Sequence, residues 1–155
     1  MTDGISFEPM SEESAEHLGA ALAVIDPWAH YRYTGEALTK YFSTNEEDAP
    51  RFQILVGDAL AGAICIRKNW LRGPYLQLLG VLPAFQKQGI GGAALSWFEA
   101  QARSSNAPNI WVVASEFNHR ALAFYERFGF ARAAMLDGLV SEGTAEILLR
   151  KRLTG

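Results

Sequence analysis

A glycine-rich segment that follows an apolar strand constrains the fold of this chain more than any other feature. Residues 75–82 are expected to form that strand, and Pro83 ends it. Residues 86–92 then lead into a helix expected over residues 89–103. Glycines let backbone N–H groups approach a ligand closely, and a helix N-terminus adds unpaired donors and partial positive charge. Lys87 adds a full positive charge, so the segment predicts an anion site that suits phosphate.

Three kinds of phosphate site contain such a turn, and two of them fit this segment poorly. A P-loop requires Gly-Lys-Ser/Thr at the end of the turn, where residues 91–93 are Gly-Gly-Ala. Residues 89–94 formally match a dinucleotide-binding fingerprint, but residues 83–88 separate the strand from its first glycine. No acid lies about 20 residues after Gly89, where a ribose hydroxyl would need one. The third kind is the pyrophosphate loop of acyl-CoA transferases, Gln/Arg-x-x-Gly-x-Gly/Ala, which residues 86–91 satisfy in full.

The apolar periodicity along the chain predicts a mixed α/β order of elements. Ser11 is a suitable N-cap for the first helix, and the Asp26-Pro27 pair is expected to end it. The expected helices begin near residues 11, 34, 89 and 118, and the expected strands cover residues 5–8, 52–56, 61–67, 75–82, 109–114, 130–135 and 145–152. No linker interrupts this order, so a single α/β domain over residues 1–155 is expected.

A second segment, residues 118–130, decides between the phosphate-site interpretations. It reads Asn-His-Arg-Ala-Leu-Ala-Phe-Tyr-Glu-Arg-Phe-Gly-Phe and resembles the Asn-x-x-Ala-x-x-Phe-Tyr-x-x-x-Gly-Phe signature of the GNAT superfamily of N-acetyltransferases. Both signatures fall in the order and on the elements of that family. The resemblance implies a GNAT fold: a mixed, mostly antiparallel sheet of about seven strands flanked by four helices. It also implies a splay between the strand before the pyrophosphate loop and the next strand.

The same resemblance implies a site for acetyl-CoA as co-substrate, with no metal. The backbone of residues 79–81 would bond the pantetheine arm, and the Val81 amide would polarise the thioester carbonyl. Asn118 would contact the pantetheine portion, and Tyr125 would donate a proton to the departing thiolate of CoA. Residues 87–92 would cradle the pyrophosphate, so the implied set is Leu79, Gly80, Val81, Lys87, Gln88, Gly89, Ile90, Gly91, Gly92, Asn118 and Tyr125.

Tyr125 makes chemical sense as a proton donor apart from the resemblance. A thiolate leaving group is helped by a donor within hydrogen-bond reach. Tyr125 follows Asn118 by seven residues, which is two helical turns, so both side chains are expected on one face. The alternative is that Tyr125 is an aromatic residue half in the core. A helix-capping role for Asn118 is compatible with its ligand role.

Neither position where the resemblance places a base can accept the proton of the acceptor's ammonium group. Many relatives carry a glutamate early in the strand before the loop or five residues before the signature asparagine. These positions are Gln77 and Val113 here. Val113 argues against the branch of the family that acetylates ribosomal-protein N-termini. The candidates for another acceptor of the proton, each with a surface position as the alternative, are in order Glu116, His30 and Glu36.

Acceptor specificity in the resembled fold depends on the first two helices and the last hairpin. Between those helices, residues 26–33 read Asp-Pro-Trp-Ala-His-Tyr-Arg-Tyr. We expect Trp28, His30 and Tyr31 to contact the acceptor, with Tyr33 beside them. The alternative is an aromatic cluster in the core.

Charge is distributed unevenly along the chain. Residues 1–50 carry ten acidic and two basic side chains, whereas the remainder carries seven acidic and twelve basic ones, for a net charge of −3. Unless these are ordinary solvated charges, the basic part attracts a polyanionic cofactor and the acidic part a cationic amine, such as a polyamine or a peptide N-terminus. No basic stripe interleaved with aromatic residues is present, which argues against nucleic acid as a partner.

The single cysteine and the hydropathy pattern indicate the cellular compartment of the protein, and the cysteine also bears on the reaction mechanism. Cys65 lies in an apolar, strand-like run remote from the loop, which indicates a buried residue in a reducing compartment and disfavours an acyl-cysteine intermediate. No apolar run reaches the roughly 20 residues of a membrane helix, and residues 1–16 lack the pattern of a signal peptide. We therefore expect a cytoplasmic protein with no membrane partner, as a monomer or a homodimer.

Taken together, these features predict an acyl-CoA-dependent N-acetyltransferase. The expected reaction transfers the acetyl group of acetyl-CoA to a primary amine by direct attack in a ternary complex. The amine belongs to a small molecule or to a peptide or protein N-terminus. Two alternatives stay open: a non-catalytic module that binds or senses acyl-CoA, and a transferase that uses a longer acyl-CoA. The absence of glutamate at positions 77 and 113 motivates the first alternative, whereas Tyr125 argues against it.

Overall fold

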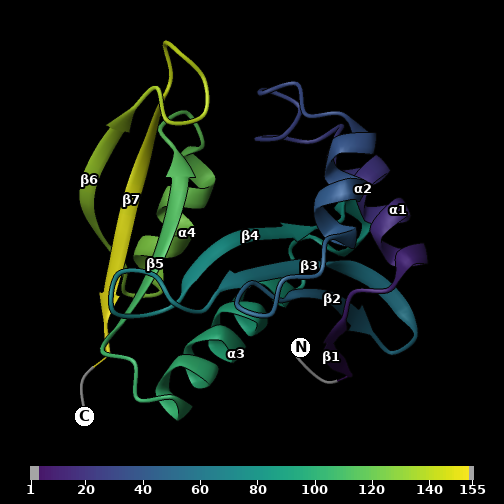
Figure 1. Cartoon of the computed structure of the whole chain (residues 1–155), viewed down its shortest axis with the longest axis horizontal. Helices are drawn as coiled ribbons and strands as arrows, with labels where there is room; N and C mark the ends of the chain where they lie inside the picture. The colour runs from purple at the N-terminus through teal and green to yellow at the C-terminus, as the bar shows by residue number, and fades with distance from the viewer. Residues whose placement is uncertain (1–3, 154–155) are drawn as a thin grey trace.

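Seven strands form one mixed sheet in the computed structural model, which describes residues 4–153 (Figure 1). Their order across the sheet is β1-β2-β3-β4-β5-β7-β6. The strands are β1 (Ile5–Pro9), β2 (Arg51–Val56), β3 (Ala59–Arg67), β4 (Tyr75–Val81), β5 (Asn109–Ser115), β6 (Ala131–Asp137) and β7 (Ala145–Arg152). The helices are α1 (Glu12–Leu22), α2 (Gly35–Ser43), the short 3₁₀ helix η1 (Pro83–Phe85), α3 (Ile90–Ser104) and α4 (His119–Arg127). The predicted α/β fold is confirmed.

The sheet opens between β4 and β5. These neighbours are the only parallel pair among the strands of residues 4–153, and they pair at just two positions, Tyr75 with Trp111 and Leu76 with Val112. Figure 1 shows β5, β7 and β6 turning away from β1–β4 as a separate arm. The predicted splay is confirmed. Within the described chain, it leaves the β5-facing edge of β4 beyond Leu76 without a strand partner.

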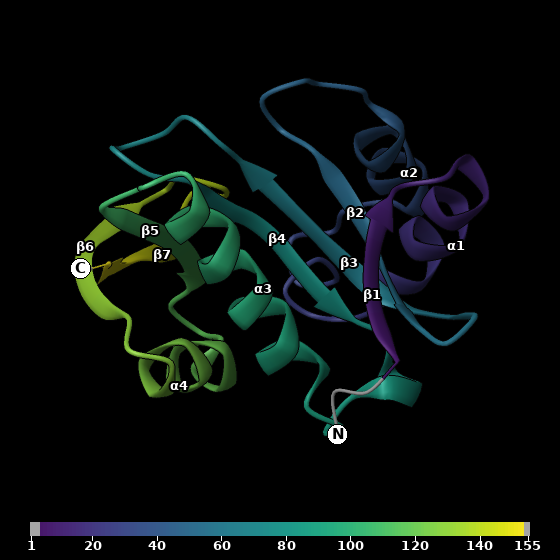
Figure 2. The same ribbon diagram turned by 90° about the horizontal axis from the view of Figure 1, so that it is seen from below.

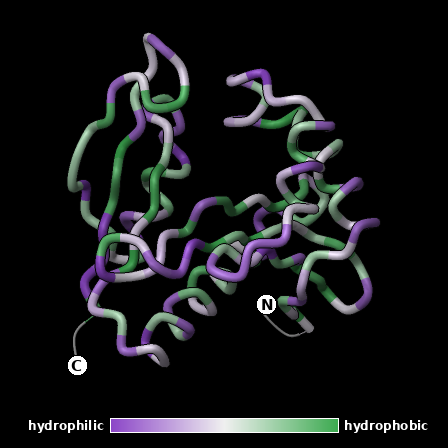
Figure 3. Tube along the Cα trace, in the orientation of Figure 1, coloured by the Kyte–Doolittle hydropathy of each residue, from purple (hydrophilic) through white to green (hydrophobic). Residues whose placement is uncertain are grey.

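Helices cover both faces of the sheet. α1 and α2 pack on one face around Leu18, Leu22 and Phe42, whereas α3 and α4 pack on the other around Phe98 and Leu122. Figure 2 shows α3 in front of the strands, with α1 and α2 together at the right. In Figure 3, hydrophobic residues follow the strands and hydrophilic residues occupy most turns. Burial of each large apolar side chain contributes about 1.5–3 kcal/mol, so two separate cores hold the layers in place.

Side-chain caps fix the starts of three helices. Ser11, Thr34 and Asn118 each accept a hydrogen bond from the backbone N–H three residues farther along the chain. Loss of such a cap costs about 1 kcal/mol. At the other end of α4, Gly129 adopts a φ of +95° and its N–H donates to the Glu126 carbonyl, which closes the helix. The predicted boundaries of α2 and α4 are therefore correct to within about two residues.

The first helix ends earlier than its apolar stripe predicts. α1 stops at Leu22, and residues 23–32 form a succession of turns. Ile25 still packs against the core under α1 and α2, which explains why the apolar pattern continues past the helix. A methyl group built on Gly80 would lie 3.1 Å from the Trp28 ring. The turns after α1 therefore pack directly onto the free end of β4.

Two kinds of feature are not found in residues 4–153. No helix there is long and apolar enough to cross a membrane. In the same residues, no group of three or more His, Cys, Asp or Glu side chains is arranged to hold a metal ion.

Candidate active site

The glycine-rich loop leads directly into the N-terminus of α3. Lys87 and Gly89 both have left-handed backbone conformations, with φ of +63° and +81°. This conformation is uncommon for a residue with a side chain, and it helps turn successive N–H groups to one side. The first bond within α3 runs from the Ala93 N–H to the Gly89 carbonyl (3.0 Å), so the N–H groups of residues 90–92 have no carbonyl partner inside the helix. The loop therefore presents backbone donors at a helix N-terminus, as predicted.

Two glutamine side chains brace this loop. Gln86 donates a hydrogen bond from Nε2 to the Val81 carbonyl (3.1 Å), across η1. Gln88 donates one from Nε2 to the Ala84 carbonyl (3.1 Å). The glutamine that opens the motif therefore fixes the loop relative to the end of β4, and both elements line the same cavity.

A cavity of about 900 Å³, named the loop cavity below, lies between the glycine-rich loop, the end of β4 and α4. Its volume is in the range of sites that hold ligands of cofactor size. Gln88, whose side chain turns back to Ala84, is not among its lining residues. The other ten residues predicted to bind the cofactor all line it: Leu79, Gly80, Val81, Lys87, Gly89, Ile90, Gly91, Gly92, Asn118 and Tyr125.

Two arginines of α4 that the sequence interpretation missed also line the loop cavity. Arg120 and Arg127 are seven residues apart and share one face of the helix; with Lys87 they give the wall three basic side chains. One acid, Asp26, lies among the same lining residues. The excess of positive charge next to the free N–H groups of α3 suits a polyanion such as a pyrophosphate. The seven-residue spacing of Arg120 and Arg127 within the signature helix is the sequence signal that could have identified them.

A second cavity, of about 310 Å³ and named the splay cavity below, lies where β4 and β5 separate. β4 contributes residues 75–79 to its wall and β5 contributes residues 113–115. The turns after α1, α4 with its cap, the β6–β7 connection and β7 complete it. The two cavities share six lining residues: Pro27, Trp28, Leu79, Asn118, Ala121 and Tyr125. Ligands in the two cavities can therefore meet at this shared wall.

Tyr125 is buried in that shared wall, with 7% of its surface exposed. Its ring packs against Phe124 and edge-on against Phe130, at centroid distances of 5.3 and 5.8 Å. Burial raises the pKa of the Tyr125 hydroxyl above its usual value, and the nearby Tyr75 adds to the shift. The hydroxyl therefore stays protonated at neutral pH, as a general acid must.

Comparison with known protein families agrees with this geometry. Residues 13–130 match the model of the Acetyltransferase (GNAT) family. The chain belongs to this family. No protein of curated function matches its sequence.

Solved structures of acetyltransferases share the fold. An acetyltransferase from Thermus thermophilus superimposes with a TM-score of 0.78 at 20% identity, over 96% of this chain and 97% of that one. The ribosomal-protein-S18-alanine N-acetyltransferase of Escherichia coli gives 0.75 at 19% identity, over 97% of this chain and 96% of that one. A GNAT family acetyltransferase from Elizabethkingia anophelis with acetyl-CoA bound gives 0.71 at 18% identity, over 97% and 99%. At these identities the likeness concerns the fold.

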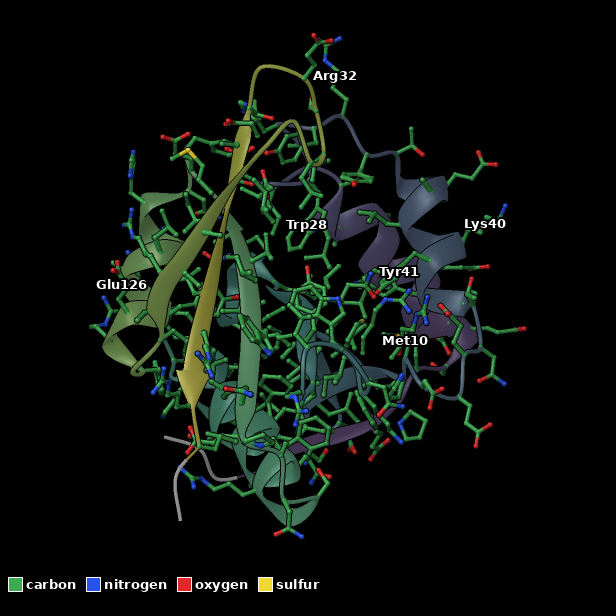
Figure 4. The ribbon with its side chains drawn as sticks, turned by 60° about the vertical axis from the view of Figure 1, so that its left-hand side comes forward. Met10, Trp28, Arg32, Lys40, Tyr41 and Glu126 are labelled. Carbon is green, nitrogen blue, oxygen red and sulfur yellow. The ribbon has the colours of Figure 1, made fainter. Side chains whose placement is uncertain are left out.

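The structure separates the aromatic residues predicted to contact the acceptor. Trp28 and Tyr31 line the splay cavity, and Trp28 also borders the loop cavity. Figure 4 shows Trp28 between the arm that carries β7 and the helices α1 and α2. His30 lies outside both cavities, where it is exposed and stacks on Phe117 with ring centroids 3.9 Å apart. His30 and Tyr31 are adjacent in the sequence of this GNAT chain, but only Tyr31 lines the splay cavity.

The glutamates predicted as proton acceptors also lie outside the two cavities. Glu116 is exposed in the turn after β5, where its N–H donates to the Ala145 carbonyl. Glu36 is exposed in the first turn of α2. Gln77 does line the splay cavity, and its Oε1 accepts a hydrogen bond from the Tyr41 hydroxyl (2.8 Å). The fold therefore brings neither glutamate together with Tyr125.

Sequence reasoning missed Glu146, a carboxylate that does line the splay cavity. It is the second residue of β7 and is 5% exposed. The hydroxyls of Tyr31 and Ser115 donate hydrogen bonds to its two oxygens, the second at 2.9 Å. The sequence signal that could have identified Glu146 is an acidic residue within an apolar strand that begins Ala-Glu-Ile-Leu-Leu. A charged residue in a buried strand needs polar partners.

The single thiol, Cys65, is expected to be unreactive in the folded protein. It is fully buried in the core under α1 and α2, and this burial raises the pKa of the thiol to about 12. Because the thiolate is the reactive form, an aromatic disulfide reagent should label no cysteine in the native protein and one after denaturation. Rapid labelling of the native protein, or transfer of an acetyl group onto Cys65, would contradict this and support an acyl-cysteine intermediate.

Proposed function

We propose that this chain is an N-acetyltransferase that transfers the acetyl group of acetyl-CoA to a primary amine. The observation that carries the proposal is the meeting of the loop cavity and the splay cavity at Tyr125. The loop cavity has cationic side chains and free helix N–H groups, which suit a polyanionic donor. The splay cavity is smaller and contains a buried carboxylate, which suits an amine. Transfer between two such ligands needs a proton donor at their junction, where Tyr125 lies.

The features of the loop cavity suit both the phosphate groups and the pantetheine arm of acetyl-CoA. Residues 87–92, Arg120 and Arg127 would bind the phosphate groups, because they combine backbone donors with positive charge. The free edge of β4 at residues 79–81 would bond the amide groups of the pantetheine arm as an additional strand. That edge runs along the loop cavity beside Tyr125. The acetyl-CoA bound to the neighbour from Elizabethkingia anophelis supports this choice of donor.

Direct attack in a ternary complex is the mechanism that the arrangement favours. The neutral amine forms a C–N bond to the thioester carbon, and the Val81 N–H would stabilise the negative charge on the carbonyl oxygen. The C–S bond then breaks, and Tyr125 donates its proton to the sulfur of CoA. Cys65 is buried in the opposite core, so the chain's one thiol is not placed to carry the acetyl group.

Two features argue against the alternative functions. A module that only binds acyl-CoA needs no proton donor, whereas Tyr125 is buried and protonated at the meeting point of the cavities. Trp28 borders that same point and packs against Gly80, so its ring would limit the length of the acyl group. Both features favour acetyl transfer.

Thermal unfolding with acetyl-CoA, followed by an acetylation assay with primary amines, tests this function. At a hundredfold excess over Kd, acetyl-CoA should raise the free energy of unfolding by about 2.7 kcal/mol. Mass spectrometry should then detect an acetylated product with at least one amine, and butyryl-CoA should react more slowly. Stabilisation with no turnover of any amine would identify a binding module instead. No stabilisation would refute the acetyl-CoA site.

A further inference from the structure

The buried carboxylate of Glu146 has no cationic partner in the described structure. None of the ion pairs found among residues 4–153 includes it. It is also the only Asp, Glu, Lys, Arg or His among the described residues that line the splay cavity. A carboxylate removed from water is costly unless it is both hydrogen-bonded and paired with a cation. The splay cavity is therefore arranged to receive one positive charge from a ligand.

The hydrogen bonds to Glu146 orient the carboxylate and leave it able to accept more. Tyr31 donates to one oxygen and Ser115 to the other. A carboxylate offers about four lone-pair positions, so two stay available for the N–H groups of an ammonium ion. The negative charge also acts on its neighbours: it contributes, after burial, to raising the pKa of the Tyr31 and Tyr75 hydroxyls.

The register of β5 and β7 places Glu146 close to the position of a missing base. Ser115 pairs with Glu146 and Val113 pairs with Leu148, and alternate residues of a strand share one face. Val113 and Ser115 therefore face the same side, and both line the splay cavity. Glu146 therefore lies on the neighbouring strand, opposite Ser115 and two residues along from the position of Val113.

Aromatic rings and aliphatic side chains form most of the rest of the splay cavity, beside the polar side chains of Gln77, Ser115 and Asn118. Trp28, Tyr31, Tyr33 and Tyr75 contribute rings, and aromatic faces attract cations as well as apolar groups. On the β6–β7 connection, Leu139 and Val140 also line this cavity and are 57% and 44% exposed. One carboxylate beside several aromatic rings fits an amine with one charge and an aromatic or other apolar body.

We propose that Glu146 binds the ammonium group of the acceptor, and that the acceptor is a monocationic primary amine with an aromatic or other apolar substituent. This inference rests on the proposed acetyl transfer and narrows its substrate class. The ammonium transfers one proton to the Glu146 carboxylate, and the freed lone pair forms the C–N bond. As the C–S bond breaks, Tyr125 protonates the sulfur; the second proton on nitrogen then restores the Tyr125 hydroxyl. Glu146 returns its proton to water.

The role of the carboxylate is tested by measuring kcat/KM for the acetylation of phenethylamine and of aniline by the native protein and by the Glu146→Gln variant. Phenethylamine carries a positive charge at pH 7.5, whereas aniline is neutral and has a ring of the same size. The variant should lower kcat/KM for phenethylamine by about 30-fold or more, but for aniline by less than about 3-fold. Acetyl-CoA should stabilise the variant as it stabilises the native protein. Glu146→Asp, which keeps the charge, should retain the preference for the charged amine.

Equal losses for phenethylamine and aniline would overturn the role of Glu146, since a purely structural effect would not distinguish the two amines. Selectivity of the native protein tests the substrate class even if the variant fails to fold. Phenethylamine should exceed phenylalanine, which adds a carboxylate, and spermidine, which adds two ammonium groups, by about tenfold or more in kcat/KM. Faster acetylation of either competitor would overturn the class while leaving acetyl transfer intact. Acetylation of no amine would instead refute the proposed function.

Discussion

Replacement of Tyr125 by phenylalanine is expected to lower kcat for acetyl transfer by about 100- to 10,000-fold. The phenylalanine ring keeps the packing against Phe124 and Phe130 but removes the proton donor at the junction of the two cavities. The departing thiolate of CoA would then take its proton from water. Because the hydroxyl is needed only as the C–S bond breaks, the affinity for acetyl-CoA should change little.

Steady-state kinetics and a binding titration with acetyl-CoA separate these two effects. Tyr75→Phe is the matched control, because Tyr75 is also a tyrosine of raised pKa in the splay cavity but does not line the loop cavity. It should retain most of the activity. Comparable activity of Tyr125→Phe and Tyr75→Phe would remove Tyr125 from the mechanism.

The pH dependence of the native protein provides a check on the same assignment. Burial raises the pKa of Tyr125, so its hydroxyl keeps the proton through the alkaline range in which ordinary amines become neutral. Because Glu146 would bind the charged amine, kcat/KM for phenethylamine should stay about level between pH 7 and pH 9 and should not fall at the upper end. A decline over that range, absent from Tyr125→Phe, would mean that the hydroxyl ionises too early to act as the acid.

The backbone shape of the glycine-rich loop and the start of α4 could be predicted from sequence because both are local segments. Residues 86–92 form a turn whose backbone shape depends on its own glycines, and α4 begins at the cap that Asn118 provides. The backbone geometry of each signature therefore depends on residues within the signature itself. The splay followed from the resemblance alone, since nothing in residues 75–82 indicates that β4 and β5 pair at only two positions.

The lining of the splay cavity could not be predicted because its residues meet only through the tertiary fold. Glu146 reaches the splay cavity because β7 pairs with β5 in a register that sets it opposite Ser115, 31 residues away along the chain. Tyr31 comes from turns without periodicity, where no pattern indicates which of His30 and Tyr31 faces inward. Glu116 was a reasonable candidate by its place near the signature, but the turn after β5 directs it to solvent.

Replacement of Gly91 by glutamate is expected to weaken acetyl-CoA binding by at least about 100-fold. Gly91 lines the loop cavity in the first turn of α3, next to the N–H groups that would hold the pyrophosphate. A carboxylate there would oppose the phosphate charges, and unfavourable like-charge contacts cost several kcal/mol, whereas 100-fold requires about 2.7 kcal/mol. Its Cβ would lie 3.2 Å from the Phe124 ring, a tight contact that also narrows the site.

Isothermal titration calorimetry with acetyl-CoA measures this loss, and Ser96→Glu is the matched control. Ser96 is exposed on the same helix and lines neither cavity, so the same added charge should leave the affinity almost unchanged. Glutamate in the first turn of a helix is favourable for the helix itself, so Gly91→Glu should remain folded by circular dichroism. A folded Gly91→Glu protein that binds acetyl-CoA as tightly as Ser96→Glu would place the pyrophosphate elsewhere. The glycine-rich loop would then be a structural turn, and Lys87, Arg120 and Arg127 would lose their assigned ligand.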